Sequence, residues 1–537
     1  QKPEIAELIG ICRTLEGLPR HASTHAAGVV IADKPLDEYL PLYRGKNGEL
    51  VTQYDMKRVE KIGLIKFDFL GLRNLTVIAN TLSLISKQGK TPPDMEKLAL
   101  DDPDTYRLLS AGDTTGVFQL ESKGMKDLLK RVIPENFDDI TALVALYRPG
   151  PIESGMIDDY VERKHGRRSV EYPIPELEPI LKETYGVIVY QEQVMKIAGV
   201  LAGYSMAEAD DLRKAMGKKI VEIMAAQRER FVSGAIANGV HKAEADKLFS
   251  LIDKFGGYGF NKSHSAAYAL IAYQTAFLKA HYPIEFMASL LTSEMNSTDS
   301  VVKFIAECGS HGIPVLPPDI NESEREFSVS GTKIRFGLVA VKNVGEGAIE
   351  TVIEARKEKK FSSLFDFCER VDLKKVNKRV IESLIKCGAF DSTGDYRSRM
   401  TAVLDDAVEY GQRVQRERTG PQIGLFGSAK ENETARDLPR MPEIEEWEEK
   451  DLLAFEKEYL GFYITGHPLN KHEELLSKFT NADSLTIKDM NDGEIVRFGG
   501  IIINSRIIQT RKGDTMAYVV TEDMHGSIET TVFPSIY

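Results

Sequence analysis

The sequence has little cysteine and no long apolar run. Its four cysteines, Cys12, Cys308, Cys368 and Cys387, lie far apart and form no C-x-x-C pair, which argues against a zinc knuckle and a disulfide framework. No run approaches the roughly 20 apolar residues of a membrane span. The first residues, QKPEIAELIG, lack the basic-then-apolar layout of a secretory signal. These absences favour a reducing cytoplasm and no membrane partner.

A surplus of positive charge is also missing. The chain has 69 Lys and Arg against 81 Asp and Glu, for a formal net charge of −12, which taken alone argues against nucleic-acid binding. The charges occur in blocks, however. The stretch 443–451 is acidic apart from Lys450, whereas LRKAMGKKIV at 212–221 has no acid and carries Arg213, Lys214, Lys218 and Lys219. Because local potential decides where phosphates bind, an acidic chain can still hold a cationic channel.

The length of 537 residues implies several domains, because single cores stop growing at about 250–300 residues. Alternation predicts strands at 24–34 and 61–72, and Asn74 is a plausible cap for a following helix. The pattern is then mainly helical to about residue 300. There is no initiator Met, and the last residues break off inside a β-rich pattern, so we expect an excised fragment.

The later part of the chain changes character twice. Residues 300–395 mix short β signals with helices, and a polar, charged segment follows from about 410 to 450. Past residue 490 the sequence alternates and has turn signals at Lys512-Gly513-Asp514 and His525-Gly526. This pattern predicts an antiparallel β domain or the start of a small barrel.

The stretch 254–283, KFGGYGFNKSHSAAYALIAYQTAFLKAHYP, is the most informative in the chain. Its backbone can bend easily at Gly256, Gly257, Gly259 and Asn261. Lys262, Ser263 and His264 follow, and then a helix-forming run that begins near Ser265. Unpaired N–H groups at a helix start, together with hydroxyl, imidazole and ammonium groups, suit a phosphate. Tyr268, in the first turn, could stack on a base or sugar. The alternative is an ordinary glycine-linked helix capped by Ser265.

A carboxylate on the second predicted strand is a candidate metal ligand. Lys66 and Asp68 share one strand face, whereas Ile65, Phe67 and Phe69 form an apolar opposite face, from which we expect Asp68 to be rigidly placed. Phosphoryl transfer from a nucleoside triphosphate needs carboxylates that hold two metal ions about 3.5–4 Å apart. Lys66 could neutralise a triphosphate oxygen. A Lys-x-Asp pair on one face is also common on ordinary sheet surfaces.

Several blocks together resemble the C-family polymerases, the alpha subunits of bacterial DNA polymerase III. They are the 254–283 stretch, GLIKFDFLGLR at 63–73, GVFQLES at 116–122, ALYRPGP ending at Pro151, YQEQVM at 190–195 and LRKAMGKK at 212–219. The resemblance implies that Asp68 is a catalytic metal ligand. It implies nucleotide contacts by Lys66, Arg148, Arg213, Lys214, Lys218, Lys219, Ser263, His264 and Tyr268, and a DNA contact by Lys262. Without the resemblance, the basic cluster at 212–219 is equally consistent with a solvated basic face.

The resemblance also exposes a gap. The family takes its other two metal-binding carboxylates from an upstream Pro-Asp-x-Asp-type motif. Here the pairs Pro93-Asp94 and Pro318-Asp319 lack the matching second Asp. One carboxylate cannot hold the two Mg²⁺ ions of the intact enzyme. We therefore expect the fragment to bind a catalytic metal poorly and not to polymerise.

Two segments look like helix-hairpin-helix turns. AVKNVGEGAIE at 340–350 has Lys342 beside Gly345 and Gly347, whose backbone N–H groups could grip a duplex phosphate. VIESLIKCGAFD at 380–391 places Gly388 after a helix. Ordinary helical turns are the alternative. The resemblance favours DNA binding by Lys342 and the three glycines.

The polar segment contains one apolar island, GPQIGLFG at 420–427. Gln422, Leu425 and Phe426 are exposed anchors suited to another protein's pocket, and the pattern is similar to the peptide with which bacterial polymerases bind the sliding clamp, the beta subunit. The terminal segment resembles an oligonucleotide-binding (OB) barrel. Its candidate contacts to single-stranded template are Arg506, Arg511 and Lys512.

These observations predict a multidomain α+β chain with partners in DNA replication. We expect the end of a thumb or connector at 1–23, part of a polymerase-beta-like palm at 24–75, mainly helical fingers at 76–299, a clamp-binding region with tandem hairpins at 300–440, a connector at 441–490 and a partial OB-type barrel at 491–537. The expected activity is template-directed DNA synthesis from deoxynucleoside triphosphates (dNTPs) on primer-template DNA, alongside other replicase subunits. The alternative is a non-catalytic scaffold that binds DNA and the clamp.

Overall fold

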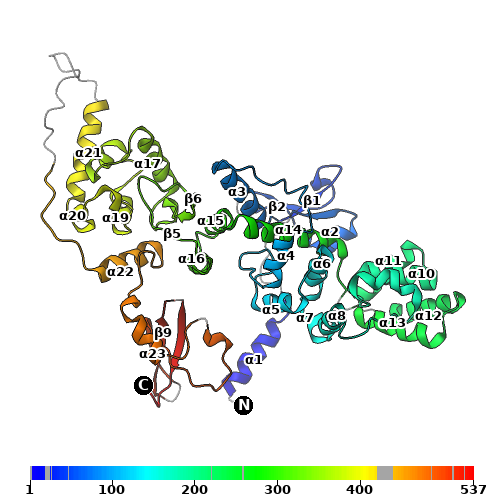
Figure 1. Ribbon diagram of the computed structural model, residues 1–537. Helices are drawn as coiled ribbons and strands as arrows, with labels where there is room; N and C mark the ends of the chain where they lie inside the picture. The colour runs from blue at the N-terminus through cyan, green and yellow to red at the C-terminus, as the bar shows by residue number, and fades with distance from the viewer. Residues whose placement is uncertain are drawn as a thin grey trace. The chain divides into compact units, whose positions relative to one another are not determined.

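The structure is a computed structural model that describes residues 3–18, 24–25, 27–45, 48–69, 71–218, 221–256, 259–419, 439–484, 486–510, 513–524 and 526–537. The chain divides into two compact units, Gln1–Arg73 and Asn74–Tyr537 (Figure 1). Helices predominate and the sheets are small, so the multidomain α+β prediction is confirmed at this level. No helix in the described ranges is both long and apolar enough to cross a membrane.

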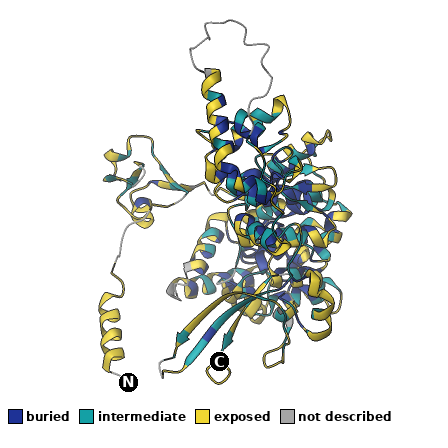
Figure 2. Cartoon of the chain, turned by 90° about the vertical axis from the view of Figure 1, so that its left-hand side faces the viewer, coloured by how far each residue is buried: buried dark blue, intermediate teal, exposed yellow. Residues whose placement is uncertain are grey.

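The first unit is built from short elements around a small core of Leu40, Val59 and Leu64. Its elements are α1 (Pro3–Leu15), β1 (Gly28–Ile31), η1 (Leu36–Glu38), β2 (Leu42–Arg44), β3 (Leu50–Thr52), α2 (Met56–Lys61) and β4 (Ile65–Asp68). β1 pairs antiparallel with β4, with Gly28 opposite Asp68, and β2 pairs with β3. The strands are therefore present but shorter than the sequence predicts. α1 has no buried residue, as its exposed surface in Figure 2 shows.

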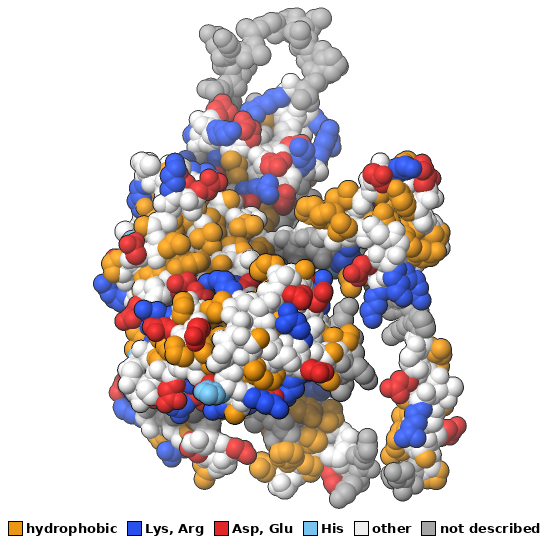
Figure 3. All heavy atoms as spheres, turned by 90° about the vertical axis from the view of Figure 1, so that its right-hand side faces the viewer, with side chains coloured by type: hydrophobic (Ala, Val, Ile, Leu, Met, Phe, Trp, Pro, Cys, Tyr) orange, Lys and Arg blue, Asp and Glu red, His pale blue; other side chains and the backbone are white. Residues whose placement is uncertain are grey.

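The apolar face of β4 is not covered by described residues. Ile65, Phe67 and Phe69 are 63%, 43% and 65% exposed. Hydrophobic side chains accordingly gather on the surface of this unit in Figure 3. Packing of this face against described residues therefore does not hold the strand, and the rigid placement of Asp68 stays a prediction. β4 is held by its backbone pairing with β1.

The second unit is organised around α14 (Lys262–His281), a helix of 20 residues. Its Tyr273 is fully buried, and the hydroxyl group donates to the Ala99 carbonyl at 2.9 Å and accepts from the Asp102 N–H at 3.0 Å. The helices that share this core are α4 (Pro103–Ser110), α5 (Lys123–Val132), α6 (Phe137–Leu146) and α8 (Met156–Lys164), with α7 (Pro149–Glu153) between the last two.

A neighbouring helical group precedes α14 in the chain. It consists of η2 (Pro175–Leu177), α9 (Glu178–Leu181), η3 (Lys182–Thr184), α10 (Gln191–Ala202), α11 (Met206–Lys218), α12 (Val221–Ala237) and α13 (Lys242–Phe255). Phe231 and Phe249 pack in its core with ring centres 5.5 Å apart. α10 is anchored by the buried Gln193, whose Oε1 accepts from the Val189 and Tyr190 N–H groups at 2.8 and 3.0 Å. This group thus presents a well-fixed α10 to the start of α14.

The largest core lies between α3 (Arg73–Lys87) and the region after α14. α3 begins one residue before the predicted cap Asn74. Its small sheet has the order β5-β7-β6, with β5 parallel and β6 antiparallel to β7. The further elements are α15 (Pro283–Ser293), α16 (Thr298–Ser310), β5 (Val315–Leu316), β6 (Ser328–Ser330), β7 (Lys333–Arg335), η4 (Leu338–Ala340), α17 (Glu346–Glu358), α18 (Leu364–Arg370), α19 (Lys378–Lys386), η5 (Asp391–Thr393), α20 (Arg397–Ala402), α21 (Leu404–Thr419) and α22 (Glu449–Leu460).

The C-terminal segment forms the predicted antiparallel sheet, with the strand order β10-β9-β8. Its elements are η6 (Asn470–His472), α23 (Glu473–Phe479), η7 (Thr486–Asp489), β8 (Ile501–Gln509), β9 (Thr515–Glu522) and β10 (Ser527–Val532). The Asp523 carboxylate accepts from the Ser484 N–H and hydroxyl at 2.6 and 2.7 Å, which ties the sheet to the preceding loop. The described strands do not close a barrel.

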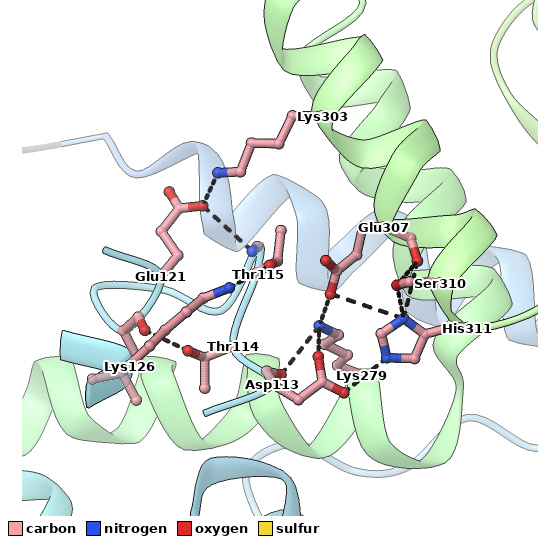
Figure 4. A network of polar contacts seen from close by, with 12 residues as sticks. Asp113, Thr114, Thr115, Glu121, Lys126, Lys279, Lys303, Glu307, Ser310 and His311 are labelled. Atoms are coloured by element: carbon pink, nitrogen blue, oxygen red, sulfur yellow. Dashed lines mark hydrogen bonds and ion pairs between the residues drawn. The ribbon is translucent and has the colours of Figure 1, made fainter. Parts of the chain in front are cut away.

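A buried lysine joins three segments of the second unit (Figure 4). The Lys279 side chain on α14 is 2% exposed, and its Nζ lies 2.7 Å from Asp113 Oδ1 and 2.6 Å from Glu307 Oε1. Asp113 follows α4, whereas Glu307 belongs to α16. At the rim, His311 Nε2 lies 2.8 Å from Asp113 Oδ2, and Nδ1 lies 3.0 Å from the Glu307 carbonyl oxygen. The network fixes the C-terminal half of α14 to its neighbours.

The charged forms are favoured in this network. Burial alone would raise the pKa of the Asp113 carboxyl group, but hydrogen bonds from Lys279 and His311 outweigh it and lower that pKa. Burial alone would lower the pKa of His311, but its bonds to Asp113 and the Glu307 carbonyl prevail and raise that pKa.

We predict that Lys279→Met loosens α14, because it removes the buried positive charge shared by Asp113 and Glu307 and leaves only His311 beside them. The opening free energy of α14 should fall by roughly 3 kcal/mol, measured by native-state hydrogen exchange of its amides. Lys303→Met is the matched control, since Lys303 pairs with Glu121 in an exposed ion pair, 51% and 46% accessible. The control should cost less than about 1 kcal/mol. Equal effects of the two substitutions would contradict this role of Lys279.

We predict that His311→Gln destabilises the fold more at pH 5.5 than at pH 8.5. A pKa raised on folding means that protonation stabilises the folded state. That stabilisation is complete below the unfolded-state pKa of about 6.5 and is lost as pH rises through the folded-state pKa. Thermal unfolding midpoints at the two pH values measure the effect. His472→Gln, at an exposed position, controls for loss of a histidine. A destabilisation that does not change with pH would refute the role of His311.

Candidate functional site

The start of α14 is clamped to α10 through backbone and side chains. Phe260 forms a parallel bridge with Tyr190: the Gln191 N–H donates to the Phe260 carbonyl at 2.9 Å, and the Phe260 N–H donates to the Val189 carbonyl at 3.4 Å. Gln191 Nε2 also donates to the Gly259 carbonyl at 3.2 Å. The segment that leads into α14 is therefore held at several points on one neighbour.

The helix begins at Lys262 and is capped by Asn261, not by Ser265. Asn261 Oδ1 accepts from the His264 N–H at 2.8 Å, and Glu192 Oε2 accepts from the Lys262 N–H at 2.9 Å. Two of the N–H groups that the sequence predicts to be open to a phosphate are thus bonded within the protein. The hydroxyl of Ser263 and the imidazole of His264 are exposed at this end. Any anion would meet mainly these side chains.

An aromatic row runs from this end of α14 into the core. We define the aromatic row as Phe260, His264, Tyr268 and Phe118. The Phe260 and His264 rings are 5.3 Å apart and nearly perpendicular, at 79°. His264 lies 4.2 Å from Tyr268, and Tyr268 lies 5.3 Å from Phe118. Tyr268 is half-buried and belongs to the second turn of α14, since the helix starts earlier than predicted.

Arg148 lies at the outer end of the aromatic row. It caps the short helix α7, and its Cζ lies 4.1 Å from the centre of the Phe260 ring. Its Nε donates to the Ala145 carbonyl at 3.0 Å. Burial lowers the pKa of the guanidinium group. A partly desolvated arginine held against an aromatic face is a strong donor to phosphate.

The basic cluster of α11 is partly neutralised by its own helix. Asp210 Oδ1 lies 2.8 Å from Arg213 Nη2, and Asp210 Oδ2 lies 2.8 Å from Lys214 Nζ. Hydrogen bonds from Lys214 and then Arg213 lower the pKa of Asp210, and the bond to Asp210 raises the pKa of Lys214. Arg213 Nη1 reaches Gln191 Oε1 at 3.5 Å, which connects α11 to the α14 entry. The Lys218 side chain and Lys219 lie outside the described residues.

Lys262 has an internal partner. Its Nζ lies 2.5 Å from Glu183 Oε2 and 5.4 Å from the centre of the Tyr190 ring. The side chain is thus directed to neighbours that hold α14, and a DNA contact would have to compete with this ion pair.

Asp68 and Lys66 belong to the first unit. The Asp68 backbone ends β4 opposite Gly28, but its side chain lies outside the described residues. Lys66 is half-buried and lines a cavity of about 660 Å³ together with His25, Tyr43 and Met56. The sequence grouping of Lys66 with Asp68 therefore remains a prediction.

Among the described residues, Asp113, Glu307 and His311 form a group whose possible metal ligand atoms lie within 4.8 Å of one another. Lys279 Nζ already lies within 2.7 Å of both carboxylates, in the position a cation would take. Its positive charge fills the electrostatic role of a metal ion there. We therefore interpret this group as an ion-pair network.

The two predicted hairpins differ. Gly345 caps α17, no heavy atom would lie within 4 Å of a Cβ at Gly345 or Gly347, and neither N–H donates to another backbone group among the described residues. Gly388 has φ +86°, its N–H donates to the Ile385 carbonyl at 3.0 Å, and the Arg397 guanidinium fills the space beside it. Gly388 thus ends α19, whereas the first hairpin offers open N–H groups. The Lys342 N–H donates to the Tyr459 carbonyl at 2.9 Å.

The remaining predicted contacts are only partly covered by the structure. Arg506 lies on β8 opposite Tyr518 and is exposed. The clamp anchors Gln422, Leu425 and Phe426, and the basic residues Arg511 and Lys512, lie outside the described residues. Sequence reasoning missed the parts played by Phe260 and Phe118, although both lie in quoted blocks. Nothing in the sequence pairs them with Arg148 or Tyr268.

Three family models match the chain. The bacterial DNA polymerase III alpha subunit finger domain matches residues 74–239, a helix-hairpin-helix motif matches residues 312–400, and the bacterial DNA polymerase III alpha NTPase domain matches residues 1–71. The finger-domain match contains Phe118, Arg148 and the α10–α11 residues. The hairpin match contains both predicted hairpins.

Curated relatives match over the whole chain. The DNA polymerase III subunit alpha of Aquifex aeolicus is 47% identical over 540 residues, which cover 100% of this chain and 44% of the relative. That of Escherichia coli K12 is 45% identical over 545 residues, covering 99% and 47%. The chain thus spans less than half the length of these relatives. It belongs to the family of bacterial DNA polymerase III alpha subunits.

Proposed function

We propose that this chain takes part in template-directed DNA synthesis, as a segment of the catalytic subunit that transfers dNTPs to a primer 3′ end. The observation that carries the proposal is the arrangement at the start of α14. Arg148 and His264 both contact Phe260, and Tyr268 contacts His264 on its other side. Gln191 connects this point to Arg213. Cationic, imidazole and aromatic groups at one place suit a nucleoside triphosphate.

The residues divide by chemistry. Arg148, Arg213 and His264 donate to triphosphate oxygens, and Ser263 adds a hydroxyl; the ring of Tyr268 supports the base or sugar. Lys214, Lys218 and Lys219 extend the positive field along α11. Donors fixed before the nucleotide arrives stabilise charge that develops during transfer without reorganising. The clamps at the start of α14 supply this fixation.

Asp68 is proposed as one metal ligand, and Lys66 as a contact to the nucleotide. The backbone of Asp68 is paired with β1, so the residue has a defined place at the end of a strand. Asp68 would help to hold Mg²⁺, and a pair of such ions would supply activation of the 3′-hydroxyl and charge stabilisation of the leaving pyrophosphate. The printed sequence offers no matching pair of carboxylates for a second ion. We therefore assign only one ligand to this chain.

DNA contacts are proposed for the first hairpin, through Gly345 and Gly347, and for Arg506 on the C-terminal sheet. Lys342, whose side chain is exposed, is a further candidate. Lys262 and Gly388 are weaker candidates, because the Lys262 ammonium pairs with Glu183 and the Gly388 N–H already donates to the Ile385 carbonyl. The proposal also includes sliding-clamp binding through residues 422–426 and association with other replicase subunits. It further includes a cytoplasmic location and the domain limits given above. A short peptide tethered to a ring on DNA raises effective concentration and supports processive synthesis.

We predict that the 537 residues alone extend no primer, because they supply only one of the carboxylate ligands that two metal ions need. When they are joined to an upstream segment that carries the other two carboxylates, nucleotide incorporation should appear. Asp68→Ala should then lower it by about a thousandfold. The same substitution should leave thermal stability nearly unchanged, which controls for misfolding. Extension by the 537 residues alone, or undiminished extension by the joined Asp68→Ala protein, would refute this assignment. Tight DNA binding without any incorporation would favour the scaffold alternative.

We predict that Arg213→Gln combined with Lys214→Gln flattens the salt dependence of primer-template binding. Each lost phosphate contact should reduce the slope of log affinity against log salt by about 1. The control is Arg167→Gln with Arg168→Gln, which also removes two exposed, carboxylate-paired cations. Adding Lys218→Gln and Lys219→Gln to the first variant should flatten the slope further. An unchanged slope would mean that the cluster only faces solvent.

A further inference from the structure

The apolar side chain of Phe260 carries no group that could act directly in catalysis. It directly precedes Asn261, the cap of α14. Its backbone is fixed on both sides, because its N–H and carbonyl bond to Val189 and Gln191. A ring on so constrained a backbone has few positions available. Phe260 is therefore a rigid support, half-buried at the entrance to the helix.

The ring contacts two groups of the proposed triphosphate site at once. The Arg148 guanidinium carbon lies 4.1 Å from the ring centre, within the range of a cation–π contact. The His264 imidazole lies 5.3 Å away at 79°, an edge-to-face arrangement. Arg148 comes from the start of α7 and His264 from the first turn of α14. One aromatic ring thus sets the separation of two donors that come from different elements.

The far side of His264 is also supported. Its ring lies 4.2 Å from Tyr268, and Tyr268 rests on Phe118 at 5.3 Å. Phe118 is buried, and its N–H donates to Thr275 Oγ1 at 3.1 Å, further along α14. The imidazole is consequently held between Phe260 and a Tyr268 that is itself anchored. Removing Phe260 would release one side of this support and one face of the Arg148 site.

We propose that Phe260 is a positioning residue for the triphosphate of the incoming nucleotide: its ring holds Arg148 and His264 at the spacing that the phosphates need. The proposal rests on the proposed function and adds the residue that organises that site. Phe260 touches no reacting atom; it acts through Arg148 and His264. An aromatic ring at this position is required, whereas apolar bulk alone is insufficient.

The test compares Phe260→Leu with Phe260→Tyr in the full-length subunit, with steady-state incorporation as the readout. The KM for dNTP should rise about tenfold in Phe260→Leu, with kcat changed much less, and Phe260→Tyr should restore it. Tyr396→Leu is the matched control, because it removes a ring that lies 4.5 Å from Arg399 outside this site; its KM should not change. Should Phe260→Leu fail to fold, Phe260→Met, which keeps apolar bulk without a ring, takes its place.

A double-mutant cycle separates positioning from packing. If Phe260 acts through Arg148, Phe260→Leu should add little to the KM of Arg148→Gln, whereas independent effects would multiply. Multiplying effects, or a KM unchanged in Phe260→Leu, would overturn the proposal. The proposed function has a separate test. If Arg148→Gln and His264→Gln both leave the KM for dNTP unchanged, no triphosphate binds here. Loss of nucleotide affinity in those two variants but not in Phe260→Leu would refute only the role of Phe260.

Discussion

The clamp between α10 and the start of α14 is the constraint on which the proposed site depends. A glycine-rich entry could adopt many conformations, and its ordering costs conformational entropy. Here that entry is tied by the Tyr190–Phe260 bridge, by Gln191 on the Gly259 carbonyl and by Glu192 on the Lys262 N–H. With the backbone fixed, the rings and cations around Phe260 have defined places. The backbone at the proposed site is therefore held in place by α10 more than by α14 itself.

The other half of α14 is fixed by a different type of interaction. Lys279 is buried between Asp113 and Glu307, so one charge holds the loop after α4 and helix α16 against the same helix. α16 leads into the region of the hairpins, whereas the loop leads to Phe118 of the aromatic row. Buried pairs of this type favour one arrangement, because breaking them leaves unpaired charge. α14 thus joins the proposed nucleotide site to the proposed DNA-binding region within one unit.

Local features could be predicted from sequence, and pairings between distant segments could not. The strands at β1 and β4, the helix after the glycine turn and the antiparallel C-terminal sheet follow from alternation and turn residues. Asn261 could have been identified as the cap, because its side chain suits the N–H three residues on. The Lys279 network joins residues 166 and 28 positions apart, and the Arg148–Phe260 stack joins α7 to the entry of α14. Such contacts arise only from tertiary packing. The alternation in β4 identifies its apolar face but does not say whether that face is exposed.

The central claim is that an incoming nucleotide binds at the start of α14. Carbon-13 labelling of histidine, with His264→Gln to assign the signal, allows the His264 imidazole to be followed by NMR during titration with dNTP and primer-template DNA. The account predicts that the His264 signal shifts on nucleotide addition while those of distant histidines, such as His472, stay in place. A His264 signal that does not move at saturating nucleotide would contradict it.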